Sequence, residues 1–211
     1  MKKLFITGLS ALMLLGVAGC GASYSDAVLS GEADGYTFHA VGGWGEWEAK
    51  DGNKMTATSV KAVSEFSKDL ADKLSKKSLK YLYVMTIKTT DASWGADDPK
   101  AKVNGEVKTF PGGCTVKCIR ATWNKEESTY VNDQWIPNPA DTSPAHMEAL
   151  TDNLWVSPYQ KDLDPDGFSW ADNPVVTSGV GSYHFVVAQY TATSSESVVG
   201  YGFGLVPVVL K

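Results

Sequence analysis

The stretch SYHFVVAQYTA, residues 182–192, decides the fold class. It is rich in β-branched and aromatic residues, which favour strands. A second run of the same kind, VVGYGFGLVPVV (residues 198–209), follows after the polar segment 193–197. Two β-rich runs joined by a short polar loop predict an antiparallel hairpin at this end of the chain.

The second run alternates glycine with large apolar residues over residues 200–205. Because side chains alternate across a strand, Tyr201, Phe203 and Leu205 are expected on one face, with only glycines on the other. A face without side chains allows another element to approach closely. We therefore predict a packing surface there, not a phosphate-binding loop, which would need a following helix.

Three further segments are predicted to be strands: residues 36–41, 80–89 and 114–123. Residues 80–89 are apolar on both faces, which indicates a central strand covered on both sides. Asn104-Gly105 lies between two short candidate strands and is a strong hairpin-turn signal.

One amphipathic helix is predicted over residues 59–76, with Thr58 or Ser59 as its N-cap. Apolar residues recur there every three or four positions and form one stripe. They are Val60, Val63, Phe66, Leu70 and Leu74. The pairs Asp69–Lys73 and Asp72–Lys76 are spaced for ion pairs on the solvated face.

Together these elements predict a mainly β (α+β) fold, an antiparallel sheet or sandwich with one amphipathic helix packed on it. We expect a single domain over residues 36–211, although two small β-rich halves, broken near residues 137–144, are an alternative. Residues 124–173 are expected to be irregular, apart from a short helix starting at Ser143-Pro144.

The chain has three cysteines, of which Cys114 and Cys118 lie in the predicted strand 114–123. Four residues of strand span about 13 Å, and a disulfide needs Cα atoms within about 7 Å. We therefore expect two buried thiols on one face of the strand, beside Val116. A turn at this position would instead favour a disulfide.

The first 20 residues have the parts of a secretory signal: two lysines, an uncharged run over residues 4–18, and Gly19-Cys20. The motif Val17-Ala18-Gly19-Cys20 resembles the lipobox of bacterial lipoproteins. This resemblance implies removal of residues 1–19, a diacylglyceryl thioether on Cys20, and a further acyl chain on its new amine. Several acyl chains on one residue give stable membrane anchoring.

The small and polar residues 20–35 are predicted to be a flexible tether between the lipid and the domain. The protein is then held at a bacterial cell membrane or outer membrane, facing outside the cytoplasm. Loss of Lys2 and Lys3 with the leader moves the formal charge from −5 to −7. Such an acidic chain is a poor partner for nucleic acid. It should also be repelled by anionic lipid, so that the anchor and not the protein surface holds it in place.

Seven tryptophans stand out in the sequence. Most neighbour glycine, proline, aspartate or asparagine, which is typical of loops. Loop tryptophans either close the edge of the core or bind a ligand, and sugar rings stack on indole while nearby polar groups bond their hydroxyls. Trp44, Trp47 and Trp94 are our candidate ligand-binding residues.

The segment YTFHAVGGWGEWEAKDGNKMTATS, residues 36–59, faintly resembles the opening strand and Gly-Trp turn of starch-binding modules on bacterial surface lipoproteins. This resemblance implies that Trp44 and Trp47 stack on a glycan. The helix predicted from Ser59 departs from a plain sandwich module.

A further candidate site is the acidic stretch from Asp162 to Gly167. Asp162, Asp164 and Asp166 occupy positions one, three and five of a calcium loop. The second half of that loop is not present, although Asp172 can complete a non-standard site. The alternative is ordinary Pro-Asp-Gly turn chemistry.

The sequence shows no recognisable catalytic signature among its three histidines, its serines or its cysteines. His39 and His184 lie in predicted strands and are expected to be structural. We therefore expect a non-catalytic binding module, with carbohydrate as the candidate ligand. A structural lipoprotein that binds another envelope protein is the alternative, and a glycan hydrolase with an unrecognised carboxylate pair is a third possibility.

Overall fold

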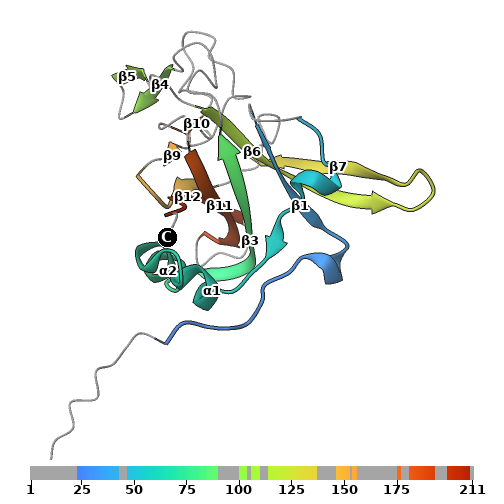
Figure 1. The fold of residues 1–211 in the computed structure, drawn as a ribbon, viewed down its shortest axis with the longest axis horizontal. Coiled ribbons are helices and arrows are strands. Elements are labelled where there is room, and N and C mark those ends of the chain that lie inside the picture. Colours follow the sequence, from blue (N-terminus) through green and yellow to red (C-terminus); the bar gives the residue numbers. More distant parts are fainter. Residues whose placement is uncertain are drawn as a thin grey trace, which may run out of the picture.

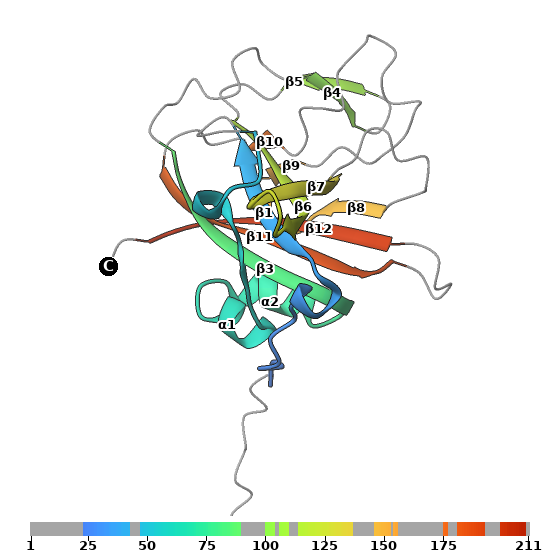
Figure 2. The ribbon, with the colours of Figure 1, turned by 90° about the vertical axis from the view of Figure 1, so that its right-hand side faces the viewer.

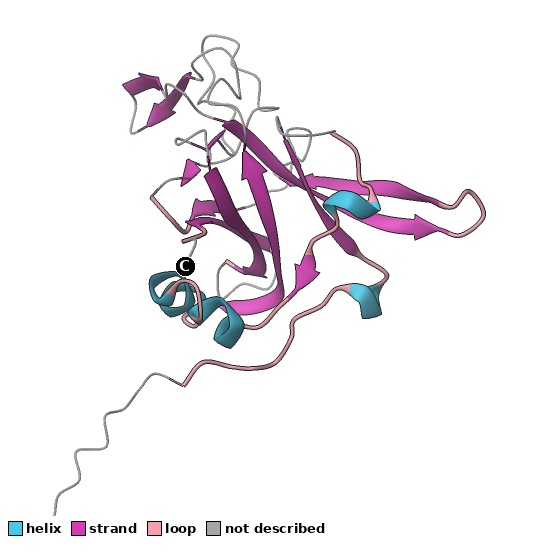
Figure 3. Cartoon of the chain, in the orientation of Figure 1, coloured by secondary structure: helices cyan, strands magenta, loops and turns pink. Residues whose placement is uncertain are grey.

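The computed structural model describes residues 23–42, 47–89, 100–103, 106–109, 114–136, 146–152, 154–155, 175–176, 181–192 and 199–209. The described part of the chain is mainly β, as the sequence predicted, with the two short α-helices together at one side (Figures 1 and 3). No helix in these segments is both long and apolar enough to span a bilayer.

Two large sheets make up the fold. The first has the strand order β1-β6-β10-β9, with β7 also paired to β6, and the second has the order β2-β3-β11-β12-β8. The strands of the first sheet are β1 (Thr37–Gly42), β6 (Cys114–Asn124), β7 (Thr129–Ile136), β9 (Leu154–Trp155) and β10 (Val175–Val176). Those of the second are β2 (Thr56–Ala57), β3 (Ser78–Thr89), β8 (His146–Ala149), β11 (Gly181–Thr191) and β12 (Val199–Pro207).

The predicted hairpins are confirmed. β11 and β12 pair antiparallel from Thr191↔Val199 to Tyr183↔Pro207. A separate pair, β4 (Lys100–Val103) and β5 (Glu106–Thr109), is joined at the predicted Asn104-Gly105 position, with Val103 opposite Glu106.

The sheets pack face to face and enclose the main core (Figure 2). Aromatic and aliphatic side chains of β3, β11 and β12 meet Phe38 and Ala40 of β1 and Val116 and Cys118 of β6. Phe38 stacks on Tyr83 with ring centroids 4.3 Å apart. Because β3 buries side chains on both faces, the prediction of a doubly covered strand at 80–89 is confirmed.

The strand geometry at Cys118 also agrees with the sequence. Cys118 is a free, fully buried thiol on the core face of β6, with its Sγ 3.9 Å from the sulfur of Met55. Burial raises the pKa of this thiol, so it stays protonated and is a packing residue.

The helical segment covers the outer face of the second sheet (Figure 2). The single helix predicted over 59–76 is wrong, because the segment forms two short helices, α1 (Val60–Ser64) and α2 (Lys68–Leu74). Ser67 interrupts the helix and caps α2, its Oγ accepting the Leu70 amide at 3.2 Å. Ser59 caps α1 in the same way, as predicted.

The apolar stripe packs on the domain, as predicted. Val60, Val63, Leu70 and Leu74 are buried against the sheet, and Phe66 packs beside them. The ion pair on the solvated face differs from both predicted pairs: Lys68 binds Asp72 at 2.7 Å, and Lys73 donates to the carbonyl of Leu150.

Two predictions for residues 124–173 are wrong. Residues 129–136 form β7, a full strand paired with β6. Residues 146–149 form β8, which runs parallel to β12, where the sequence suggested a helix starting at Ser143-Pro144. Helix-start signals at Pro144 were outweighed by pairing with the edge of β12, an interaction that local sequence does not encode.

The glycine face of β12 is a packing surface, as predicted. A Cβ at Gly204 would lie 2.9 Å from Leu70 of α2, and one at Gly202 would lie 2.7 Å from Leu150. A Cβ at Gly200 would overlap the buried ring of Tyr190. Glycine is therefore required there by close approach.

Replacing Gly200 with alanine is expected to lower the free energy of unfolding by about 1–3 kcal/mol, because an added carbon overpacks a closed site. Urea denaturation measures this change. Gly52→Ala is the matched control, since a Cβ there meets nothing within 4 Å and should leave stability nearly unchanged. Equal stability of the two variants would contradict the close packing.

The segment predicted to be a flexible tether, 20–35, differs from that expectation where it is described. Leu29 donates to Thr58 at 3.1 Å and accepts from Leu82 at 3.0 Å, and the Gly31 amide donates to the Tyr83 hydroxyl at 2.7 Å. From residue 24 the segment is thus bound to the domain and ends in a 3₁₀ turn, η1 (Glu32–Asp34).

Candidate functional site

The outer face of the first sheet carries a group of aromatic side chains on the β6–β7 hairpin, which projects to the right in Figure 1. We call Trp123, Tyr130 and Trp135 the aromatic surface. Trp123 lies directly opposite Tyr130, and Ile119 lies directly opposite Trp135. Residues directly opposite one another share a face, and so do alternate residues along β6. All three rings therefore lie on the same face.

A bulge makes this arrangement possible. Tyr130 and Trp135 are an odd number of residues apart and would point to opposite faces of a regular strand. The pairing register shifts between Arg120 and Ala121, which are opposite Gln134 and Asn132. An extra residue in one strand reverses the alternation beyond it. The bulge thus brings Trp135 to the face of Tyr130, and Asn132, an exposed amide two residues from Tyr130, lies on that face by ordinary alternation.

The rings hold one another in fixed positions. Trp123 meets Tyr130 edge to face, with centroids 4.8 Å apart and planes at 65°, and Tyr130 meets His39 at 4.4 Å and 64°. Lys117 lies over the ring of Trp135 at 5.6 Å. Yet Trp123 remains 44% exposed. A large, rigid aromatic side chain in water is a feature of binding surfaces.

A loop packs over the same face beside the hairpin. It runs from Trp47 through a 3₁₀ turn, η2 (Asp51–Asn53), and its Ala49 packs on the buried cluster of Val41, Ile119 and Ala121. Asp51 of this loop accepts a hydrogen bond from the Tyr130 hydroxyl at 2.6 Å. Trp47 is 41% exposed at the start of the loop.

His39 fixes the loop from below. It is fully buried, its Nδ1 lies 2.9 Å from the Lys50 carbonyl and 3.1 Å from Asn53 Oδ1, and its Nε2 lies 3.0 Å from Thr37 Oγ1. Burial lowers the pKa of His39, which keeps it neutral, with Nδ1–H as the donor. The expectation of a structural histidine is confirmed.

The hydrogen bond to Asp51 gives a measurable signature. It raises the pKa of Tyr130 to about 12, because ionisation would place two negative charges side by side. Alkaline titration at 295 nm should include the ionisation of Tyr130 near that value, and Asp51→Asn should move that part of the titration toward the ordinary range near 10. Since the folded pKa is raised, this contribution to stability is complete below pH 10 and is lost as pH rises toward 12. An Asp51→Asn protein with an unchanged titration would contradict the contact.

The other predicted site residues are only partly described. Trp47 is exposed, as a binding role requires, whereas Trp44 and Trp94 lie outside the described residues. Cys20 and the proposed calcium ligands also lie outside them: Asp162, Asp164, Asp166 and Asp172. Within the described segments no three His, Cys, Asp or Glu side chains gather as a metal site would require.

Trp123 and Tyr130 are site residues that were not predicted from the sequence. Trp123 was placed in a strand, and its alternation with Ile119 and Ala121 is the signal that could have assigned its face. The strand that carries Tyr130 and the bulge were not predicted. Comparison with known proteins adds no assignment, because no protein-family model, curated protein or solved structure matches the chain.

Proposed function

We propose that this protein is a non-catalytic carbohydrate-binding module, anchored by lipid on Cys20 to the outer side of a bacterial membrane. The observation that carries the binding role is the exposed indole of Trp123, held edge to face by Tyr130. The anchor is supported by the lipobox resemblance of Val17-Ala18-Gly19-Cys20.

The chemistry of the aromatic surface fits a sugar. The C–H faces of a pyranose ring stack on indole, and its hydroxyls need polar partners beside the stack. Asn132 supplies an exposed amide on the same face, between the rings of Tyr130 and Trp135. Asp51 supplies a carboxylate beside Tyr130. The surface therefore offers both an indole for stacking and polar groups for the hydroxyls.

The length of the surface favours an oligosaccharide over a single sugar. Trp135 lies opposite Ile119, which is four residues from Trp123 along β6. Four residues of strand extend about 13 Å. A chain of sugar rings along the hairpin would contact both indoles, and each indole would then contribute to the binding free energy.

The rigidity of the surface also favours binding. The rings lie on paired strands, and their neighbours hold them by close ring contacts and by the hydrogen bond from Tyr130 to Asp51. Little conformational entropy is then lost on binding, which is how pre-organised aromatic surfaces gain affinity.

Glycan-array screening, followed by affinity electrophoresis in polysaccharide gels, tests the proposal. We expect retention by at least one polysaccharide. An absence of retention on every glycan tested would contradict it, and recovery of one constant protein after crosslinking in intact cells would then favour the protein-binding alternative.

A further inference from the structure

The start of the described chain is bound unusually close to the proposed lipidation site. We call residues 23–35 the N-terminal strap. The amide of Lys61 donates to the Ser25 carbonyl at 2.9 Å, and the Tyr24 hydroxyl donates to Asp72 of α2. The Tyr81 hydroxyl donates to Asp34 at the other end of the strap. The strap is therefore fastened to the domain at both ends.

This fastening limits how far the domain can lie from the lipid. Ser23 follows Cys20 by three residues, so their Cα atoms can be at most about 11 Å apart. The headgroup layer of each leaflet is about 5–8 Å thick. With lipid on Cys20, so short a connection to a domain bound at Tyr24 keeps the surface beside the strap close to the membrane.

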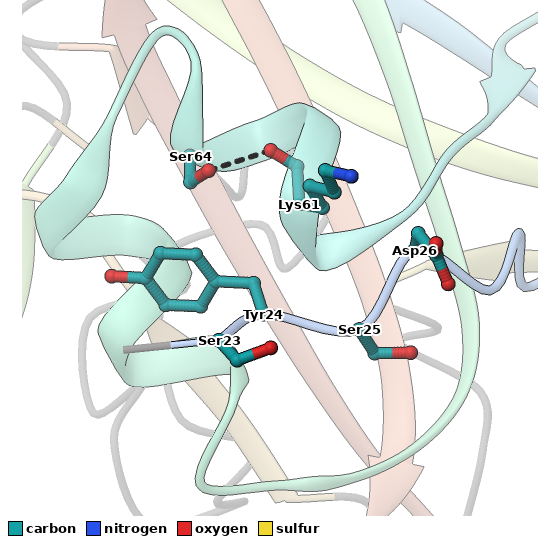
Figure 4. A pocket seen from close by; sticks show the side chains of 6 residues that line it. All are labelled: Ser23, Tyr24, Ser25, Asp26, Lys61 and Ser64. Carbon is teal, nitrogen blue, oxygen red and sulfur yellow. Dashed lines mark hydrogen bonds between the residues drawn. The ribbon is translucent and has the colours of Figure 1, made fainter. Parts of the chain in front are cut away.

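That surface is the start of the strap together with α1, at the bottom of Figure 2 and far from the tip of the β6–β7 hairpin in Figure 1. It contains an open pocket of about 720 Å³ (Figure 4). The lining residues are Ser23, Tyr24, Ser25, Asp26, Lys61 and Ser64. Serine hydroxyls and a lysine ammonium suit a phosphate group, and Asp26 can accept from an amine or hydroxyl of a headgroup.

This surface presents one exposed lysine beside the strap. The start of the strap and α1 hold Lys61 beside the acidic residues Asp26 and Glu65, and the next lysines of the helical segment lie on or after α2. Lys68 is paired with Asp72. Lys61 is exposed, and within the described segments it forms no ion pair. Lys61 is therefore the group of this surface that can pair with a phosphate.

We infer that the strap and α1 form a contact surface for phospholipid headgroups, with the pocket at Lys61 receiving a headgroup phosphate of the same membrane that anchors Cys20. The inference rests on the proposed lipidation of Cys20 and extends it, because the domain then has a fixed orientation. Its helical side faces the lipid, and the β6–β7 hairpin extends away from the anchor.

Depth-dependent fluorescence quenching tests the orientation. Full-length protein carrying Glu65→Cys in the α1–α2 connection, or Glu126→Cys at the hairpin tip, is purified from membranes in its lipidated form and labelled with NBD. It is then reconstituted into vesicles of equal phosphatidylcholine and phosphatidylglycerol that contain a headgroup nitroxide. Parent protein without the added cysteine gives the background. We expect quenching at residue 65 to exceed that at residue 126 by at least twofold.

Charge reversal tests the role of Lys61. Lys61→Glu should reduce quenching at residue 65 by at least half, whereas Lys125→Glu, the same change at the exposed hairpin tip, should not. Equal quenching at the two labels, or equal effects of the two reversals, would overturn the inference while leaving the anchor intact. Mass spectrometry showing an unmodified Cys20 thiol would overturn the anchor and this inference together, and glycan binding would still be testable separately.

Discussion

Replacing Phe185 with alanine is expected to lower the free energy of unfolding by about 3–5 kcal/mol. Phe185 is fully buried on β11 and faces the first sheet, with its ring 6.3 Å from that of Phe203 and nearly parallel to it. Removing the ring leaves a cavity between the two sheets. The strands on either side are held by their own pairing, so they cannot move together to fill it. Chemical denaturation followed by far-UV circular dichroism measures the change.

Val199→Ala is the matched control for this prediction. Val199 starts the neighbouring strand β12 and is 40% exposed, so its truncation should change stability by about 0.5 kcal/mol or less. If Phe185→Ala were as stable as Val199→Ala, the two sheets could not enclose a common core at this position.

Replacing Trp123 with alanine is expected to weaken glycan binding by at least tenfold, which corresponds to about 1.4 kcal/mol of binding free energy. Exposed aromatic anchors commonly contribute more than this. The variant removes the indole and also the edge contact that orients Tyr130. Affinity electrophoresis or calorimetry with the retained polysaccharide measures the loss.

Val131→Ala is the control on the same hairpin. Val131 is 46% exposed and lies opposite Thr122, which places it on the other face from Trp123. Its truncation should leave the Kd unchanged. Trp47→Ala tests whether the loop shares the site, and a loss there with none at Trp123 would move the binding site away from the hairpin. Thermal unfolding of each variant separates loss of binding from loss of fold.

Much of the fold could be predicted because local patterns and tertiary structure agree over long stretches. Residues 182–192 and 198–209 carry strong strand propensity, and their pairing is local in the sequence. The glycine alternation over residues 200–205 predicted a packing face, and Leu70, Leu150 and Tyr190 occupy it.

What the sequence did not reveal depends on contacts between distant segments. The apolar stripe over residues 59–76 continues through Phe66, but the Ser67 side chain caps a new helix and breaks the first. Strand β8 exists because the edge of β12 lies beside it. Neither effect changes the hydrophobic period, so periodicity alone could not detect them.

The candidate site was partly predictable for the same reason. Exposed loop tryptophans were anticipated, and Trp47 is one of them. The gathering of Trp123, Tyr130 and Trp135 on one face required a bulge in β7. A one-residue shift reverses which side chains share a face, and no turn residue marks its position.

The most direct test of the aromatic surface is the indole N–H spectrum of isotopically labelled protein during titration with the retained oligosaccharide. The Trp123 and Trp135 signals are assigned from Trp123→Phe and Trp135→Phe spectra. We expect the Trp123 signal to show one of the largest shifts. The Trp135 signal should shift only with oligosaccharides long enough to reach both indoles. Saturable binding that leaves both signals unmoved would contradict the proposed site.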